Sequence, residues 1–309
     1  MIRLGSKLAP PGSEPAGPDR GIGRSHAIHV EDLDAFARLH REKGYRAAYC
    51  PPVSIGDTER LRDIRRAFEA QDVLIAEVGA WHNPLHPDPA EAKAERKRLA
   101  EGLAVAEEVN ARCAISLIGS LVTADAKIWH ERNIGDEAFD AAVEVARAII
   151  DEVRPRRASL VFEIYPFSVN DTPANIRRLL DAVDRDRFGA HMDLVNLVNC
   201  PRAYFGNAAL LAESLKLFGD RIVSAHAKDV AMARGEGRSM SAAISVVLEE
   251  TRPGLGGIDY AAYLRGLHGL PHTVPLMLEH LEDQIAYDAA ADYIRGVAAA
   301  EGIDLEASG

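Results

Sequence analysis

The sequence contains little cysteine, only Cys50, Cys113 and Cys200 among 309 residues. The three are far apart and odd in number, and they form no Cys-x-x-Cys pair. This pattern argues against both a thiolate zinc site and a disulfide framework. It fits a reducing compartment, and we therefore expect a cytoplasmic protein.

The chain also lacks basic charge and long apolar runs. Its 36 lysines and arginines face 47 aspartates and glutamates, a net charge of −11. This balance excludes the basic surface that favours binding to a nucleic-acid backbone, and it suits an anionic membrane surface poorly. No apolar run approaches the ~20 residues of a membrane span, and the N-terminus lacks a signal-peptide layout. We expect neither nucleic acid nor membrane as a partner.

A Gly-x-Gly-x-x-Gly motif is missing after the first apolar run, so a dinucleotide-binding fold loses its main support. The chain instead alternates short apolar runs with segments of helical periodicity. The predicted strands cover residues 1–8, 45–50, 73–80, 113–118, 159–164, 188–192, 222–227 and 274–279. The predicted helices cover residues 30–43, 57–71, 89–110, 136–153, 172–183, 207–218, 259–267 and 285–299.

Strict alternation of strand and helix indicates a parallel sheet. Eight such units in 309 residues predict an α/β protein with a closed (β/α)8 TIM barrel, forming one domain over residues 1–309. Residues 9–23, rich in proline and glycine, are predicted to form a long loop over the barrel mouth. A disordered linker is the alternative, but so near the terminus it would connect nothing of size.

Four of the apolar runs end on a residue that can bind a metal ion. These residues are Glu163, Asp193, His226 and Glu279, at the ends of predicted strands five to eight. A lone acidic residue at a strand end is usually a helix cap or a salt-bridge partner. Four in register on consecutive strands predict a metal site, because barrel chemistry gathers at the carboxyl ends of the strands. Three carboxylates and one imidazole suit Mn²⁺, with Mg²⁺, Co²⁺ or Zn²⁺ as alternatives.

Five short motifs in this part of the chain resemble the sugar phosphate isomerase/epimerase superfamily. They are Phe162-Glu163-Ile164, His191-Met192-Asp193, His226-Ala227-Lys228-Asp229, the segment 253–260 (Pro-Gly-Leu-Gly-Gly-Ile-Asp-Tyr) and Leu278-Glu279-His280. This superfamily, the xylose isomerase-like TIM barrels or AP endonuclease family 2, includes ketose 3-epimerases and endonuclease IV.

The resemblance implies a divalent metal held by Glu163, Asp193, His226 and Glu279, with Glu163 and Glu279 as acid and base on opposite faces of the substrate. A metal that chelates a carbonyl and the neighbouring hydroxyl acidifies the C–H between them. One carboxylate can then remove that proton and the other can return it. The implied activity is isomerisation or epimerisation of a carbohydrate-like hydroxy-carbonyl compound through an enediolate. Relatives are often dimers or tetramers, which makes a homo-oligomer the family expectation.

Two positions depart from the best-known relatives. Ketose 3-epimerases usually have histidine where this chain has Asn196, and arginine where it has Met232. Endonuclease IV also needs the histidine, which together with the acidic charge disfavours DNA repair. Two alternatives remain open. One is the catalytic subunit of a metal-dependent C-glycoside deglycosidase, a lyase that works with a small partner subunit. The other is a non-catalytic sugar-binding or scaffold protein.

Further residues are candidates for contact with the substrate. Trp81 and His82 follow predicted strand three at the barrel mouth, where Trp81 could wall a sugar ring and His82 could bind a hydroxyl or transfer a proton. Asn196 could touch substrate or cap the following turn. Packing of the loop for its own sake is the structural alternative for the first two residues.

Lys228 and His191 share strand parity with predicted ligands and should face the barrel interior. Lys228 could bind an anionic substrate oxygen, or it could form a salt bridge with Asp229 or Glu279. His191 could contact substrate, support a ligand or be a buried, hydrogen-bonded histidine.

Overall fold

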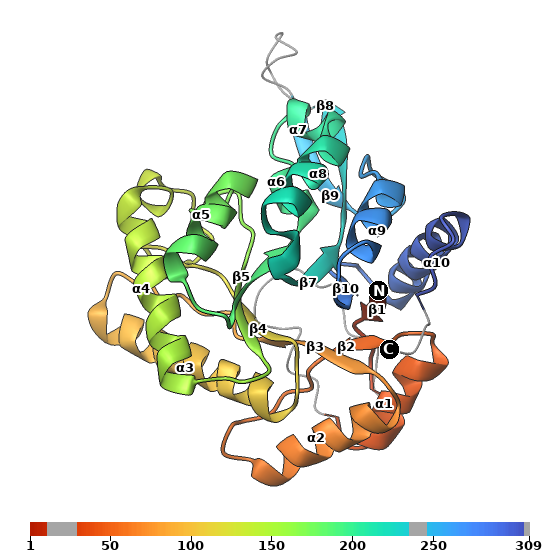
Figure 1. Cartoon of the computed structure of the whole chain (residues 1–309), viewed down its shortest axis with the longest axis horizontal. Coiled ribbons are helices and arrows are strands. Elements are labelled where there is room, and N and C mark those ends of the chain that lie inside the picture. The colour runs from red at the N-terminus through yellow and green to blue at the C-terminus, as the bar shows by residue number, and fades with distance from the viewer. Residues whose placement is uncertain (11–29, 235–245, 306–309) are drawn as a thin grey trace.

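The computed structural model describes residues 1–10, 30–234 and 246–305. Eight parallel strands close a barrel in the order β1-β10-β7-β6-β5-β4-β3-β2, and helices surround it (Figure 1). The predicted (β/α)8 barrel is therefore confirmed. The proline- and glycine-rich segment at residues 11–23, most of the predicted mouth loop, lies outside the described residues.

The barrel strands lie close to their predicted positions. They are β1 (Ile2–Ser6), β2 (Ala47–Tyr49), β3 (Leu74–Gly79), β4 (Cys113–Ser116), β5 (Ser159–Glu163), β6 (Phe188–Met192), β7 (Ile222–Ala227) and β10 (Val274–Leu278). The main helices are α1 (Leu33–Glu42), α2 (Thr58–Ala70), α3 (Pro89–Glu108), α4 (Asp136–Val153), α5 (Pro173–Val183), α8 (Asn207–Phe218), α9 (Tyr260–His268) and α10 (Gln284–Ala300).

Side-chain caps fix the start of six of these helices. In each, an oxygen of the capping residue accepts a hydrogen bond from a backbone N–H of the first turn, a contact that contributes about 1 kcal/mol. The capping residues are Asp32, Asp57, Asp88, Thr172, Asp259 and Asp283. Proline at the first helical position strengthens α3 and α5. Local sequence therefore determines where these six helices begin.

The barrel has an apolar shell between strands and helices and a smaller packed interior. Inside, Ala47 and Ala76 pack around Met277. Gly5 leaves the room that Met277 needs, since a Cβ atom at Gly5 would lie 2.3 Å from the methionine sulfur. Small residues on β1 to β3 thus admit a large side chain from β10.

An antiparallel hairpin after β7 was not predicted. Its strands are β8 (Asp229–Arg234) and β9 (Val246–Thr251). Two short helices, α6 (Leu194–Leu197) and α7 (Pro201–Phe205), follow β6, and the 3-10 turns η1 (Glu131–Asn133) and η2 (Gly219–Arg221) precede α4 and β7. Most described side chains of β9 are exposed, so this strand lacks the buried face that gives a strand its alternating pattern, whereas Val230 of β8 is buried.

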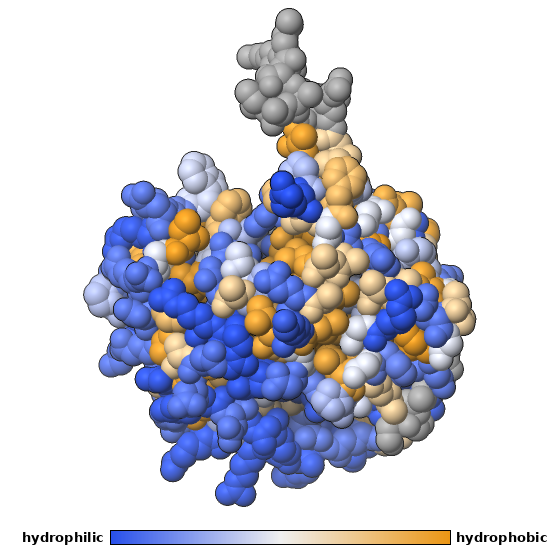
Figure 2. Space-filling model, turned by 45° about the horizontal axis from the view of Figure 1, so that its top comes forward, coloured by the Kyte–Doolittle hydropathy of each residue, from blue (hydrophilic) through white to orange (hydrophobic). Residues whose placement is uncertain are grey.

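The face in Figure 2 is largely hydrophilic, with hydrophobic residues gathered near its centre and towards the β8–β9 hairpin. In the described part of the chain, no helix combines the length and the apolar character needed to cross a membrane.

Candidate metal centre and adjoining pocket

The four predicted ligands meet at one point of the barrel mouth. Glu163 is the last residue of β5, Asp193 directly follows β6, His226 lies in β7 and Glu279 directly follows β10. These strands are consecutive neighbours in the barrel. Each residue offers one ligand atom, and all four atoms lie within 4.8 Å of one another. The cluster could hold a metal ion.

His226 presents its Nδ1 atom to the three carboxylates. This atom lies 2.9 Å from Glu279 Oε2, 3.3 Å from Glu163 Oε1 and 3.4 Å from Asp193 Oδ2. Asp193 divides its two oxygens, since Oδ2 faces this cluster while Oδ1 accepts the backbone N–H of Asn196 at 3.1 Å. The donor set is therefore one imidazole nitrogen and three hard oxygens.

The environment of Glu279 fits a bound cation. Its Oε2 atom is buried and makes no hydrogen bond, although Lys228 Nζ and His226 Nδ1 each lie 2.9 Å away. Both nitrogens are thus close to the oxygen without the alignment that a hydrogen bond requires. A metal ion imposes no such donor direction, and oxygen-rich sets of this kind suit Mn²⁺ or Mg²⁺.

Lys228 lies inside the carboxylate cluster. Its ammonium group is 2.8 Å from Asp193, 2.9 Å from Glu279 and 3.4 Å from Glu163. Burial alone would lower the pKa of Lys228, but these three carboxylates raise it well above its ordinary value. The same burial would raise the pKa of Glu279, and the charges of His226 and Lys228 lower it well below its usual range. Of the two salt-bridge partners predicted for Lys228, the structure shows Glu279.

Glu77 completes the centre and was missed by the sequence analysis. It projects from β3 and is 1% exposed. It accepts hydrogen bonds from Ser224 Oγ, from His191 Nε2 at 3.3 Å and from His226 Nε2 at 3.3 Å. Burial alone would raise the pKa of Glu77, but the charge and hydrogen bonds of the two histidines lower it. A carboxylate can only accept, so His226 donates through Nε2 to Glu77 and keeps Nδ1 turned towards the cluster.

The signal that could have revealed Glu77 is its place in the sequence. It stands in Leu-Ile-Ala-Glu-Val-Gly, a strand that is otherwise apolar. A carboxylate inside a buried strand needs partners there, since burying a charge without them is costly. Glu77, His191 and His226 also lie close enough to form a second possible ligand group. Because Glu77 already accepts three hydrogen bonds, we interpret this group as a hydrogen-bond network.

Two of the predicted substrate contacts lie below or beside the cluster. His191 is buried, its Nε2 donates to Glu77, and its Nδ1 has no hydrogen-bond partner. Asn196 donates from Nδ2 to the Ile164 carbonyl at 2.8 Å and to Glu163 at 3.4 Å. Asn196 therefore holds Glu163 in place as well as lying near the mouth.

The side chains of Trp81 and His82, which are neighbours in sequence, have different surroundings. Trp81 lines the pocket that adjoins the metal cluster. His82 Nδ1 lies 2.8 Å from Glu95 on α3, and His82 is not among the residues that line this pocket. Burial is the main cause that lowers the pKa of His82, and Glu95 opposes it.

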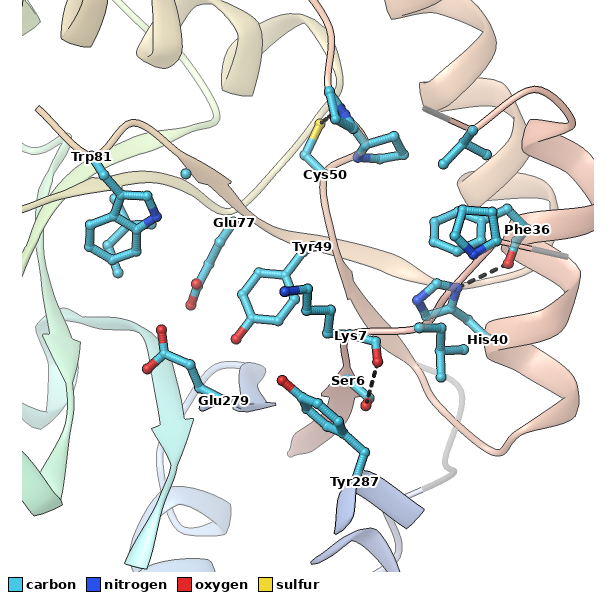
Figure 3. Close-up of a pocket in the computed structure, with 17 residues that line it drawn as sticks. Ser6, Lys7, Phe36, His40, Tyr49, Cys50, Glu77, Trp81, Glu279 and Tyr287 are labelled. Carbon is cyan, nitrogen blue, oxygen red and sulfur yellow. Dashed lines mark hydrogen bonds between the residues drawn. The ribbon is translucent and has the colours of Figure 1, made fainter. Parts of the chain in front are cut away.

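The pocket has about 750 Å³ of empty space, part of it open to solvent. It extends from Glu279 and Glu77 towards β1 and β2, and Trp81, Tyr49 and Tyr287 surround the space in front of Glu279 (Figure 3). The metal cluster thus has direct access to a cavity of ligand size.

Asp229 explains the spacing of two of the sequence motifs. Its carboxylate accepts backbone N–H groups from Gly254, Gly256 and Ile258 at 3.0, 3.1 and 3.0 Å. A Cβ atom at Gly256 would lie 2.2 Å from Asp229 Oδ1. The His-x-Lys-Asp motif therefore ends in a residue that binds the glycine-rich loop, and this part of the pattern is structural.

The fold and the cluster can now be compared with known proteins. A family model described as the xylose isomerase-like TIM barrel matches residues 14–301. The chain belongs to this family. No curated protein sequence matches it.

Solved structures of the same fold include several family members. A xylose isomerase-like TIM barrel protein from Mycobacterium smegmatis, in complex with magnesium, is 17% identical with a TM-score of 0.62, covering 87% of this chain and 90% of that one. A 3-keto-D-glucoside 4-epimerase from E. coli is 12% identical with a TM-score of 0.62, covering 96% and 100%. D-psicose 3-epimerase from Clostridium cellulolyticum H10, with D-tagatose, is 12% identical with a TM-score of 0.61, covering 96% and 99%. At these identities the likeness shows the fold.

Proposed function

We propose that this protein is a metal-dependent sugar isomerase or epimerase that moves a proton within a carbohydrate-like hydroxy-carbonyl substrate. The observation that carries the proposal is the convergence of Glu163, Asp193, His226 and Glu279 beside the pocket that Glu279 lines. Epimerases among proteins of the same fold support it.

A divalent ion held by these four residues would polarise the substrate carbonyl and lower the pKa of the neighbouring C–H. Mn²⁺ is the proposed ion, with Mg²⁺, Co²⁺ or Zn²⁺ as alternatives; the magnesium complex of the Mycobacterium smegmatis protein supports a divalent cation. The donor set of one nitrogen and three oxygens is compatible with each.

The protein residues then divide the proton transfer among them. Glu279 lines the pocket, and in its carboxylate form it can take the proton from carbon. The electron pair of that C–H bond forms a carbon–carbon double bond, and the π pair of the carbonyl moves onto its oxygen, which gives an enediolate. In an epimerase, Glu163 in its protonated form gives its proton to the opposite face of the same carbon. In an isomerase a proton reaches the former carbonyl carbon, and the neighbouring hydroxyl proton moves to the former carbonyl oxygen. Exchange with solvent then returns both carboxyl groups to their starting forms. Lys228, held in its ammonium form, can donate a hydrogen bond to the oxygen on which charge develops.

Solvent deuterium exchange tests this proposal. Ketoses, their phosphates and keto-glycosides are incubated with the Mn²⁺-supplied protein in D₂O, and exchange into carbon-bound positions is followed by NMR. Glu279→Gln and Glu163→Gln should each slow exchange about 10³-fold, because a positioned acid or base contributes on this scale. Glu282→Gln changes an exposed glutamate three residues from Glu279 and should leave the rate unchanged.

Two results would count against the proposal. Exchange that survives in both glutamine variants would exclude Glu163 and Glu279 as the acid and base. Absence of stoichiometric Mn²⁺ uptake in elemental analysis would overturn the metal centre itself.

A further inference from the structure

The wall of the pocket beside the metal cluster is mostly apolar, unlike the charged cluster itself. Apart from Trp81, its walls include Phe36, Ile115, Leu8 and Val30. These side chains have no hydrogen-bonding groups, and the indole of Trp81 presents a flat apolar face. In Figure 3 the tryptophan stands on the opposite side of the cavity from Tyr49 and Tyr287. In this view the carboxylates of Glu77 and Glu279 lie between these rings. A flat group entering from the metal cluster would therefore have Trp81 on one side, the two tyrosines on the other and the carboxylates at its edge.

Most polar groups in the same wall are already used within the protein. Ser6 Oγ, Tyr49 OH and Cys50 Sγ each donate to a backbone carbonyl, at 3.4, 3.2 and 3.3 Å. His40 Nδ1 lies 3.0 Å from another backbone carbonyl, and burial lowers the pKa of His40 to about 4, so its ring is neutral. These four groups have little capacity left for a ligand.

The remaining polar lining is small. Glu77 accepts three hydrogen bonds from Ser224, His191 and His226. Lys7, Tyr287 and the indole N–H of Trp81 are the other polar groups of the lining, besides Glu279 at the metal cluster. A chain of sugar hydroxyls would lose its hydrogen bonds to water here and find few replacements, which is unfavourable. An apolar ring would gain from burial and from stacking on Trp81.

We propose that the substrate carries a flat apolar group next to its hydroxy-carbonyl unit, and that this group occupies the pocket between Trp81 and Tyr49. The inference rests on the proposed function for the reacting end, and it names the substrate class. The preferred substrates are carbohydrate-like hydroxy-carbonyl compounds that carry an aryl or similarly apolar substituent, and ketoses without such a substituent bind more weakly.

Three small hydroxyketones test this inference by calorimetry on the Mn²⁺-supplied protein. Phenacyl alcohol, hydroxyacetone and dihydroxyacetone share the same reacting unit and differ only in a phenyl, methyl or hydroxymethyl group. Phenacyl alcohol should bind at least about ten-fold more tightly than either of the others, given the area that a phenyl ring buries. Trp81→Ala should remove most of that preference while dihydroxyacetone binds as before.

Trp129→Ala is the matched control, because Trp129 is 72% exposed and does not line the pocket. It should keep the full phenyl preference. Equal or tighter binding of dihydroxyacetone by the wild-type protein would overturn the inference, and this comparison holds even where the Trp81→Ala chain does not fold.

Deuterium exchange on the same compounds separates this inference from the proposed function. A phenyl preference in binding without exchange into any compound supports the pocket assignment and overturns the isomerase proposal. Exchange into ketoses without a phenyl preference in binding supports the isomerase proposal and overturns the pocket assignment.

Discussion

The two sides of the barrel mouth are built from different chemistry. On the side of β5, β6, β7 and β10, three carboxylates, one imidazole and one ammonium group lie within a few ångströms of one another. On the side of β1, β2 and β3, the pocket wall is mostly apolar, and its polar groups are largely occupied by backbone carbonyls. Under the function proposed above, the charged side would perform the reaction and the apolar side would select the substrate.

Glu77 is the exception that connects the two sides. It comes from β3, on the pocket side, yet its carboxylate ends at His226 on β7. The orientation of His226, a candidate metal ligand on the charged side, therefore depends on Glu77 from the pocket side. The variants below test how far the two sides are separate.

The largest effect is expected from removing the cation of the charged side. Lys228→Met leaves Asp193, Glu279 and Glu163 without their ammonium partner, and breaking a buried ion pair costs about 3 kcal/mol or more. The free energy of unfolding should fall by this amount in the presence of a chelator. Saturating Mn²⁺ should restore most of the loss, because it supplies positive charge to the same carboxylates.

Denaturant unfolding with and without Mn²⁺ measures this effect. Lys97→Met is the control, since Lys97 is 77% exposed and pairs with Glu101 on the surface of α3. A Lys228→Met protein as stable as wild type in chelator would show that the charged side does not depend on its lysine.

A smaller effect is expected at the connection between the two sides. Glu77→Gln replaces an oxygen that accepts from His226 or His191 with an NH₂ group that cannot accept. His226 is then no longer held with Nδ1 towards the carboxylates, and Mn²⁺ affinity should fall roughly 10- to 100-fold. Electron paramagnetic resonance of free Mn²⁺ during a titration gives the dissociation constant.

Ser224→Ala serves as the matched comparison for Glu77→Gln. It removes one hydrogen bond to Glu77 but leaves the contact between Glu77 and His226. Mn²⁺ affinity should stay close to the wild-type value. Equal loss of affinity in both variants would mean that the network acts through general packing and does not orient the histidine.

The smallest effect concerns a glutamate at the other end of the barrel, where β5 begins. Glu107 Oε2 accepts the backbone N–H groups of residues 156, 157 and 158 at 3.1, 2.9 and 3.0 Å. Burial opposes ionisation, but these N–H groups and Arg157 lower the pKa of Glu107 below its ordinary value. Glu107→Gln should reduce the free energy of unfolding at pH 7 by about 1.5 kcal/mol.

The pH dependence of this loss follows from the direction of the pKa shift. A lowered pKa in the folded state contributes stability above the unfolded-state pKa, and the contribution disappears as pH falls through the folded-state pKa. The difference between wild type and Glu107→Gln should therefore be full near pH 7 and vanish at acidic pH. Urea unfolding across this range measures it, with the exposed neighbour Glu108→Gln as control. If the difference in unfolding free energy did not change with pH, the effect would come from the shape of the side chain and not from its charge.

The sequence was most informative where residue type and strand position coincide. Apolar runs ending on Glu163, Asp193 and Glu279 predicted both the strands and the cluster, because parallel strands bring their carboxyl ends to one edge. Cap residues such as Thr172 located the helices for a similarly local reason. One domain over the whole chain and the roles assigned to single residues stay predictions.

Other features depend on contacts between distant parts of the chain. Glu77 meets His226 across 149 positions in sequence, and no local pattern gives that distance. His82 faces Glu95 on α3 while Trp81 turns into the pocket, although both follow the same strand. Strand β9 of the hairpin is mostly exposed, so hydrophobic periodicity does not reveal it.

The carboxylate of Asp229 affects how this barrel would tolerate insertions and deletions in the β8–β9 hairpin. The chain leaves β7, extends into the hairpin at Asp229 and returns at Thr251, where the two residues pair. Asp229 then binds the loop that follows, through Gly254, Gly256 and Ile258. The two ends of the hairpin are thereby fixed to each other and to the loop that follows. Insertions or deletions beyond that joint can lengthen or shorten the hairpin while His226 and Lys228 keep their positions.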